Sequence, residues 1–204
     1  PKVAQKKKIK KIVIKNGVTE LPEDAFRDCS KATVITIAPT VSRIGAMAFY
    51  KTGVEKITIP KKARNLGYGM LQNCKNLKKL TIPGNFWARE PKKAANKKNL
   101  IGSLILGNDN SNIVKKVKFS TDFVWQCQET LGDCEEFEVL ETDPYYKSID
   151  GCIYSKDGKR LEAVPYGRKE IDIAEGCETI DVQSYSYNIE AYINGKLERY
   201  IYGG

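Results

Sequence analysis

The chain lacks histidine altogether, and it has only two methionines and two tryptophans among 204 residues. Without histidine no Ser-His or Cys-His pair can form, so a general base would have to be Asp, Glu, Lys or Tyr. The neighbouring Glu135 and Glu136 point apart on a strand or turn, whereas glycosidase carboxylates face each other across the substrate. No glycine-rich phosphate loop has the required spacing. The sequence therefore predicts no enzyme, no catalytic residue and no cofactor.

Long apolar runs are also missing. The longest runs are a few residues, as at Leu104, Ile105 and Leu106, whereas a membrane helix needs about 20. We therefore expect no membrane insertion. No secretion signal is visible, but the chain begins at Pro1 and not at methionine, which favours a signal peptide that was removed or lies outside this stretch.

What the chain does contain is a repeat. Similar stretches start at Ile12, Ile35, Ile57 and Leu80, which are 23, 22 and 23 residues apart. The apolar positions recur in phase at Val18, Val41 and Ala63, at Leu21, Ile44 and Leu66, and at Ala25-Phe26, Ala48-Phe49 and Met70-Leu71. A period of this size indicates a solenoid, in which each unit buries its apolar face only by stacking on its neighbours.

Each unit combines two kinds of local pattern. Its start alternates apolar and polar residues, as in Ile35, Thr36 and Ile37, which predicts a short strand with one buried face. The strands should stack into one parallel sheet that buries eight residues: Ile12, Ile14, Ile35, Ile37, Ile57, Ile59, Leu80 and Ile82. The return path, PEDAF from Pro22, favours one helical turn with Ala25 and Phe26 facing inward. The expected fold class is an α/β repeat solenoid with a sheet on one face and short helical turns on the other.

These residues carry a family resemblance. The phrase I-x-I-P-x-x-V-x-x-I-G-x-x-A-F-x-x-C-x-x-L resembles the BspA-like leucine-rich repeat family of bacterial cell-surface proteins, and residues 143–180 are similar to a link that many members place between repeats. The resemblance implies an extracellular or cell-surface location. It also implies a non-catalytic module with an expected role in adhesion, which binds a protein or glycan through the exposed sheet face. The alternative is a structural spacer or recognition arm of a larger wall-associated protein, with no ligand of its own.

We expect one domain over residues 1–204. It comprises regular repeats at 12–83, an irregular loop at 84–116, and divergent repeats and hairpins at 117–204 with a C-terminal cap. Asp157-Gly158 and Asn194-Gly195 favour hairpin turns, and a further unit begins at Ile171. Two questions stay open: whether Phe86 and Trp87 pack on the solenoid or contact a ligand, and whether five tyrosines form the cap or a ligand platform. These are Tyr185, Tyr187, Tyr192, Tyr200 and Tyr202.

The six cysteines fit the core better than a metal site or disulfides. Cys29 and Cys74 share one repeat position, which Cys134 takes in the unit starting at Val117, and Cys177 takes the position of Val18. Free cysteine is among the most buried residue types. A metal site would normally show close cysteine pairs with histidine, so we expect unpaired, buried thiols and no metal.

Charge is divided unevenly along the chain. Residues 1–118 hold 26 Lys and Arg against 7 Asp and Glu, a net +19, whereas residues 119–204 carry a net −10. Such separation shapes steering and association. It is compatible with two solvated faces, with an anionic partner at the basic half, or with head-to-tail contact between molecules. No recognised nucleic-acid-binding module accompanies the lysines, so we expect no nucleic acid as partner.

The repeat phase predicts a candidate site on the outer sheet face. If Ile12, Ile35, Ile57, Leu80 and Val117 point inward, the preceding residues point outward, and four of these five are lysines. The candidate ligand-binding residues are Lys11, Lys15, Lys56, Thr58, Lys79, Thr81, Lys116 and Lys118. The ligand would be an anionic glycan or a wall polymer with sulfate or phosphate groups. The other interpretation is a solvated lysine ladder. The sequence fixes neither the partner nor the oligomeric state.

Overall fold

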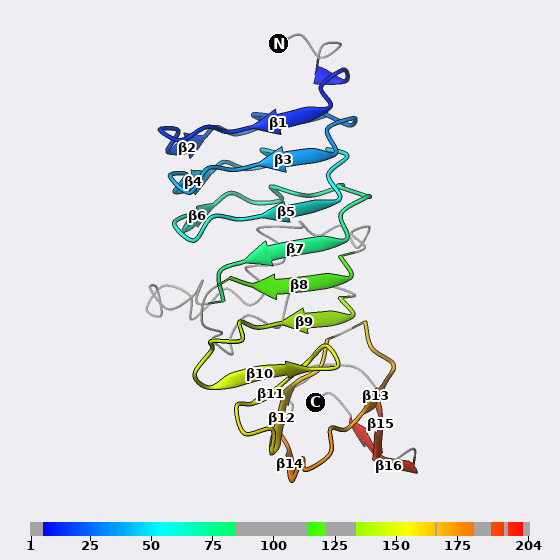
Figure 1. The fold of residues 1–204 in the computed structure, drawn as a ribbon. Helices are drawn as coiled ribbons and strands as arrows, with labels where there is room; N and C mark the ends of the chain where they lie inside the picture. Colours follow the sequence, from blue (N-terminus) through cyan, green and yellow to red (C-terminus); the bar gives the residue numbers. More distant parts are fainter. Residues whose placement is uncertain are drawn as a thin grey trace.

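A computed structural model describes residues 6–84, 114–120, 134–165, 167–181, 189–193 and 196–201. Its central feature is a six-stranded parallel sheet in the order β1-β3-β5-β7-β8-β9, which runs down the length of a solenoid (Figure 1). The strands are β1 (Lys11–Val13), β3 (Val34–Thr36), β5 (Lys56–Thr58), β7 (Lys79–Ile82), β8 (Lys116–Phe119) and β9 (Glu136–Glu138). Each coil contributes one strand, and the repeat predicts all of these strands except β9.

A second, smaller parallel sheet lies on the return path. Its strands are β2 (Glu20–Leu21), β4 (Arg43–Ile44) and β6 (Asn65–Leu66). Each begins nine residues after the strand of the main sheet in the same coil. The two sheets enclose the apolar core of the first three coils.

The predicted buried positions form this core. Ile12 pairs with Ile35, Ile57 pairs with Leu80, and all four are almost fully buried. Of the eight residues predicted to be buried, seven are, and Ile37 is partly buried but packs against the core. Alternation with a period of two therefore gave the correct inward face.

The expected helical turn after Pro22 is wrong. Asp24 has a φ of 55°, and the N–H of Phe26 donates to the carbonyl of Ala48 in the next coil at 2.7 Å. The same bond recurs one coil later, from Phe49 to Met70 at 2.9 Å. In an α-helix these amides would bond to carbonyls four residues earlier in their own coil. Between residues 9 and 84 the return path consists of turns and two-residue strands, so the fold is a parallel β-solenoid and not α/β.

Cys29, Cys74 and Cys134 occupy the core, as the repeat phase predicts, but the position shared by Val18 and Cys177 does not, since Val18 is exposed. Cys29, Cys74, Cys134 and Cys152 are buried and unpaired; Cys177 is unpaired but only partly buried. Burial raises the pKa of Cys134 to about 11 and that of Cys152 to about 12, so these thiols stay protonated at neutral pH. Cys127 lies outside the described residues.

Beyond β9 the chain changes from coils to hairpins. A four-stranded sheet contains β10 (Tyr146–Ile149), β11 (Cys152–Ser155), β12 (Arg160–Ala163) and β14 (Thr179–Ile180). The predicted hairpin between β11 and β12 is confirmed, with Gly158 at a φ of 86° in its turn. Asp157 stabilises the turn by accepting hydrogen bonds from the Ser155 hydroxyl at 2.6 Å and the Lys159 amide at 3.0 Å.

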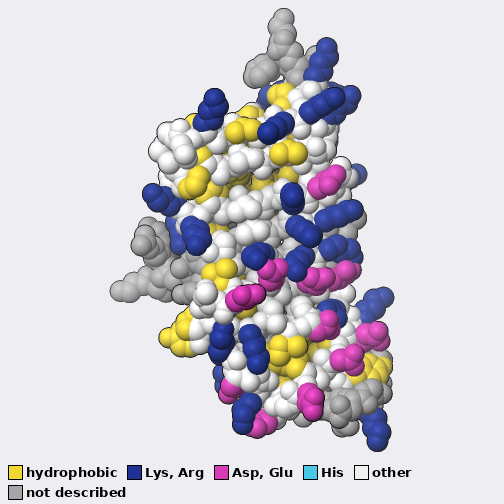
Figure 2. All heavy atoms as spheres, viewed as in Figure 1, with side chains coloured by type: hydrophobic (Ala, Val, Ile, Leu, Met, Phe, Trp, Pro, Cys, Tyr) yellow, Lys and Arg dark blue, Asp and Glu magenta, His cyan; other side chains and the backbone are white. Residues whose placement is uncertain are grey.

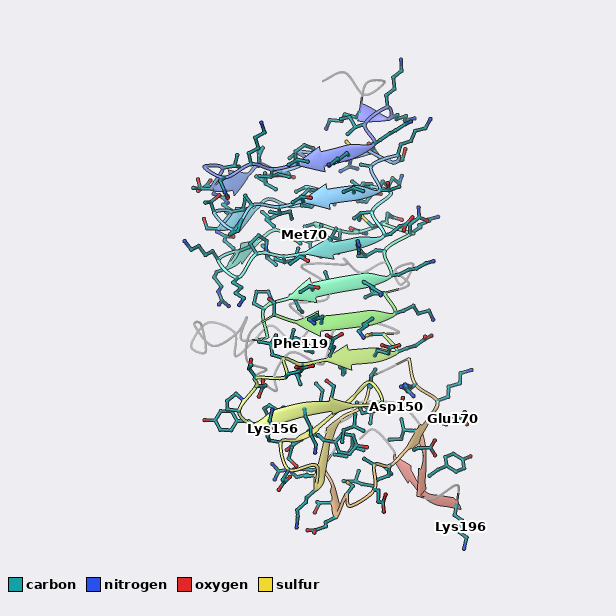
Figure 3. The ribbon with its side chains drawn as sticks, viewed as in Figure 1. Met70, Phe119, Asp150, Lys156, Glu170 and Lys196 are labelled. Carbon is teal, nitrogen blue, oxygen red and sulfur yellow. The ribbon has the colours of Figure 1, made fainter. Side chains whose placement is uncertain are left out.

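A second hairpin joins β10 to β11 and was not predicted. Ile149 pairs with Cys152, so Asp150 and Gly151 form a two-residue turn, with φ angles of 43° and 73°. Positive φ at both central residues is the geometry that Asp-Gly favours in hairpins. Figure 3 labels Asp150 at this turn, close to the last strand of the main sheet. The Asp150-Gly151 dipeptide could therefore have predicted this hairpin.

The C-terminal part forms a three-stranded sheet from β13 (Glu170–Asp172), β15 (Ile189–Ile193) and β16 (Lys196–Ile201). The predicted unit at Ile171 does begin as a strand, but this strand pairs with β15 and not with the main sheet. The predicted C-terminal hairpin is confirmed, since β15 and β16 are antiparallel. Phe86, Trp87, the tip Asn194-Gly195 and the cap residues Tyr185, Tyr187 and Tyr202 lie outside the described residues, as does the side chain of Tyr200.

Candidate functional site

The outer face of the main sheet carries the predicted column of lysines. Strand pairing joins Lys11 to Val34, Val34 to Lys56, Lys56 to Lys79, and Lys79 to Lys116. We call these five positions the lysine column. Because the strands are parallel and in register, the column crosses them along the solenoid axis. Figure 2 shows lysine and arginine side chains gathered on this face, on the side where the strands of the main sheet begin.

Beside the lysine column runs a second outward row, two residues further along each strand. It holds Val13, Thr36, Thr58, Thr81 and Lys118, and we call it the threonine row. Val13 and Val34 are 49% and 48% exposed, and Thr36 and Thr58 are also exposed. Lys15 is exposed two residues beyond the end of β1. This face therefore offers ammonium groups, hydroxyls and small apolar side chains to a partner.

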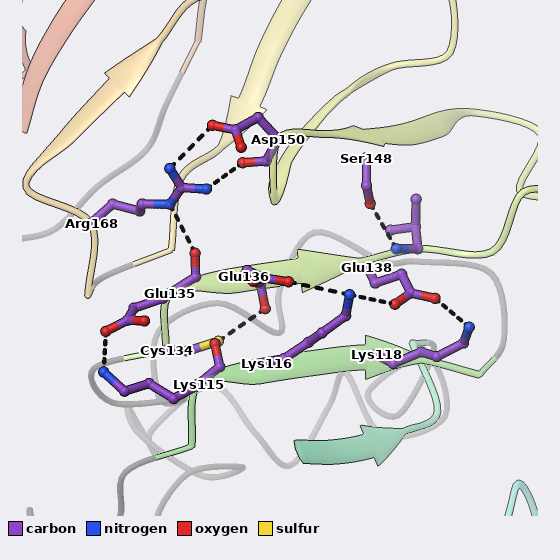
Figure 4. A network of polar contacts seen from close by, with 11 residues as sticks. Lys115, Lys116, Lys118, Cys134, Glu135, Glu136, Glu138, Ser148, Asp150 and Arg168 are labelled. Carbon is purple, nitrogen blue, oxygen red and sulfur yellow. Dashed lines mark hydrogen bonds and ion pairs between the residues drawn. The ribbon is translucent and has the colours of Figure 1, made fainter. Parts of the chain in front are cut away.

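The sign of the charge changes between β8 and β9. Strand pairing places Lys116 beside Glu136, and Lys118 beside Glu138. The Nζ atom of Lys116 lies 3.2 Å from a Glu136 carboxylate oxygen and 2.9 Å from one of Glu138. Lys118 also pairs with Glu138, and Lys115 pairs with Glu135 (Figure 4). At its β8 end the lysine column is therefore paired with carboxylates.

The lysines of the two outward rows consequently fall into two groups. Lys116 and Lys118 are engaged with glutamates of β9. Lys11, Lys56 and Lys79 form no ion pair with any residue that the structure describes, and we call them the open lysines. The glutamates of β9 were not among the residues predicted from the sequence, although the alternation of Phe137 and Val139 with acidic residues could have identified this strand.

The ion pairs shift the titration of their members. Hydrogen bonds from Lys118 and Lys116 lower the pKa of Glu138 below its ordinary value of 4.5. The hydrogen bond to Glu138 in turn raises the pKa of Lys116, against the lowering effect of its partial burial. Both groups are therefore held in their charged forms at neutral pH.

Glu138→Gln is expected to reduce the free energy of unfolding by up to about 1 kcal/mol at pH 7, since it removes half-exposed ion pairs. A carboxyl whose folded pKa is lowered stabilises the fold above its unfolded pKa, and this contribution disappears as the pH falls through the folded value. The difference from the parent protein should therefore shrink as the pH falls from about 4.5 towards 3. Urea unfolding at pH 7 and pH 3 measures it. A difference that is unchanged at pH 3 would show that the ion pairs are not its cause.

Arg168 joins this acidic end of the sheet to the hairpins. Its Nε donates to the carbonyl of Glu135 at 3.0 Å, its Nη1 to Asp150 Oδ2 at 3.1 Å, and its Nη2 to the Asp150 carbonyl at 2.5 Å (Figure 4). The guanidinium thus contacts both the residue that precedes β9 and the turn between β10 and β11. These hydrogen bonds fix the start of β9, the strand that carries Glu136 and Glu138 beside β8.

The described residues offer little support for other kinds of site. They contain no group of three or more His, Cys, Asp or Glu side chains arranged to hold a metal ion. Within the same residues no helix has the length and apolar composition to cross a bilayer.

One short parallel strand per coil, with a period of 22 or 23 residues in the first coils, is typical of leucine-rich repeat proteins. The sequence model described as BspA type leucine rich repeat region matches six copies over residues 3–122. The chain belongs to the BspA-type leucine-rich repeat family.

Several solved structures are similar to the chain. A leucine-rich repeat protein from Eubacterium ventriosum is 19% identical, with a TM-score of 0.43 over 93% of this chain and 48% of that one. The pneumococcal vaccine antigen PcpA is 14% identical, with a TM-score of 0.44 over 91% and 45%. A leucine-rich cell surface protein from Faecalibacterium prausnitzii is 17% identical, with a TM-score of 0.39 over 84% and 49%. The chain thus spans about half the length of these proteins. No curated protein sequence matches it.

Proposed function

We propose that the chain is a non-catalytic interaction module of a bacterial surface protein, and that it binds a protein or anionic glycan partner outside the cell through the outer face of its main sheet. The observation that carries the proposal is that none of the other segments that the structure describes covers this face. Exposed side chains stand on adjoining strands of this face, namely those of Val13, Val34, Thr36 and Thr58. In many domains a second layer of secondary structure covers a sheet face.

The chemistry of the face supports contact with a partner. Its outward residues are short in the threonine row and long and cationic in the lysine column, so a partner can approach the backbone closely while the lysines reach around it. The strands are held in register by the buried residues between them, so the groups are already positioned before binding. Membership of the BspA-type family is consistent with such a role.

Bulky side chains on the face test the proposal without regard to charge. Thr36→Trp with Thr58→Trp should abolish binding to any partner of the sheet face, because two exposed positions on adjacent coils become obstructed. Tryptophan is well tolerated in strands, so the fold should persist. The matched control is Arg43→Trp with Asn65→Trp, two exposed and directly paired positions on the smaller sheet.

The parent protein and both variants would be tested against sulfated and neutral glycans, bacterial wall polymers and matrix proteins. The proposal predicts at least one partner that the sheet-face variant loses and the control keeps. A partner that both variants bind equally would show that its binding site is not on the sheet face. Binding to none of the probes would favour a spacer or recognition arm without a ligand.

A further inference from the structure

We propose that the open lysines bind a linear sulfated polysaccharide that lies along the solenoid axis, across strands β1 to β7. This inference rests on the proposed function and names the partner of the same sheet face. Within the described residues, the lysine column meets carboxylates only at its β8 end.

The contact between β8 and β9 shows how this face receives anions. Lys116 lies between the carboxylates of Glu136 and Glu138, which project from the two outward rows of the next strand. Anionic groups that sit one strand away, over both rows, are therefore within reach of an ammonium group of the column. The molecule supplies these anions to β8 from its own chain.

The open lysines have no such supply in the described part of the chain. Lys56 and Lys79 pair directly across the strands, and like charges in directly opposite positions repel each other. Glu55 precedes Lys56 in the sequence, but no ion pair joins its carboxylate to either lysine. A row of external anions would form ion pairs with these lysines, as the glutamates of β9 do with Lys116 and Lys118.

The geometry of the column sets the direction of the ligand. Successive strands are about 4.8 Å apart, so Lys11 and Lys79 are separated by three steps, or roughly 14 Å along the axis. The ligand must place anions repeatedly along this line. It meets only side chains, because the backbone groups within a sheet are bonded to neighbouring strands, so it cannot bind as an added strand.

Three features of the face favour a sulfated polysaccharide over other polyanions. The open lysines match sulfate groups, the hydroxyls of Thr36, Thr58 and Thr81 match sugar hydroxyls, and the exposed Val13 and Val34 match the apolar C–H faces of sugar rings. Lysine ammonium groups act as point charges, which suits anions of variable geometry. Glu136 and Glu138 end the binding tract at β8, because they repel a polyanion and already occupy the lysines there.

The test compares two double variants with the same change in net charge. Lys56→Glu with Lys79→Glu reverses two open lysines, whereas Lys61→Glu with Lys62→Glu reverses two exposed lysines in the turn between β5 and β6. Binding to heparin at 50 mM salt should weaken by more than about tenfold in the first variant and by less than about twofold in the second. Lys56→Gln with Lys79→Gln should weaken binding in the same direction, and circular dichroism would confirm that each variant is folded.

Competing polymers complete the experiment. Heparin should bind the parent protein more tightly than either a poly(glycerol phosphate) or poly-glutamate of similar length, and its affinity should fall steeply between 50 and 200 mM salt. Equal weakening by the two charge-reversal pairs, no heparin binding at 50 mM salt, or preference for either competitor would overturn the inference. If heparin fails but the tryptophan variant loses another partner, the inference falls and the proposed function stands.

Discussion

Replacing Phe49 by alanine is expected to lower the free energy of unfolding by about 3 to 5 kcal/mol. Phe49 is fully buried, and its ring stacks on that of Phe26 in the preceding coil, with centroids 5.7 Å apart and planes 6° from parallel. Its removal leaves a cavity between coils, and the backbone bonds on either side prevent the coils from closing it.

Urea unfolding followed by circular dichroism measures this loss, and Phe26→Ala is the matched control. Phe26 occupies the same repeat position one coil earlier but is only partly buried, so its replacement should cost clearly less. A loss below about 1 kcal/mol for Phe49→Ala would show that the ring contributes little to the contact between coils.

Gly67→Ala is expected to destabilise the protein by about 3 kcal/mol or more, through crowding and not through a lost contact. A Cβ atom at Gly67 would lie 2.0 Å from the backbone nitrogen of Ala46 in the preceding coil. One at Gly45, the equivalent position, would lie 2.4 Å from the nitrogen of Glu23. Backbone atoms cannot rotate away as a side chain can, so two coils would have to separate.

The control for this prediction separates space from backbone conformation. Gly176 has a φ of 80°, but nothing lies within 4 Å of its Cβ position, so Gly176→Ala should cost only about 1 kcal/mol. Gly67 has no positive φ, and its substitution tests crowding alone. Thermal unfolding of both variants distinguishes them. Equal losses would mean that the close approach of the coils is not what requires glycine at position 67.

The main sheet could be predicted because its signal is repeated. One alternating triplet such as Ile35-Thr36-Ile37 is ambiguous alone, but copies at a fixed period identify the inward face and the register together. The same periodicity put the lysine column on one face and Cys29, Cys74 and Cys134 in the core. The phase therefore placed the side chains at these positions correctly, but not at the position of Val18, which is exposed.

The return path could not be predicted because its hydrogen bonds are not local. Pro22, Glu23 and Asp24 resemble the first turn of a helix, and local preference favours one. In the structure the amide of Phe26 bonds to the next coil instead. A bond to a residue 22 positions away leaves no trace in the preferences of a five-residue segment.

The site was predicted only in part, since its outward positions follow from phase but its ion pairs do not. The spacing from Val117 to Phe137 is 20 residues and departs from the period of 22 or 23, so the strand β9 and its glutamates were missed. Only the paired strands reveal that Lys116 and Lys118 face carboxylates while Lys56 and Lys79 do not. Which lysines are open is therefore information that the fold adds.

The hydrogen bonds between coils point along the solenoid axis, and this sets how the protein responds to force. Strands that lie across the axis are pulled apart one bond at a time when tension is applied along it, because the bonds of a coil do not share the load. A repeat solenoid held mainly by contacts between neighbouring coils should then unravel stepwise. Each coil of 22 or 23 residues would release up to roughly 75 to 80 Å of chain. A domain built in this way should extend in increments under a modest load.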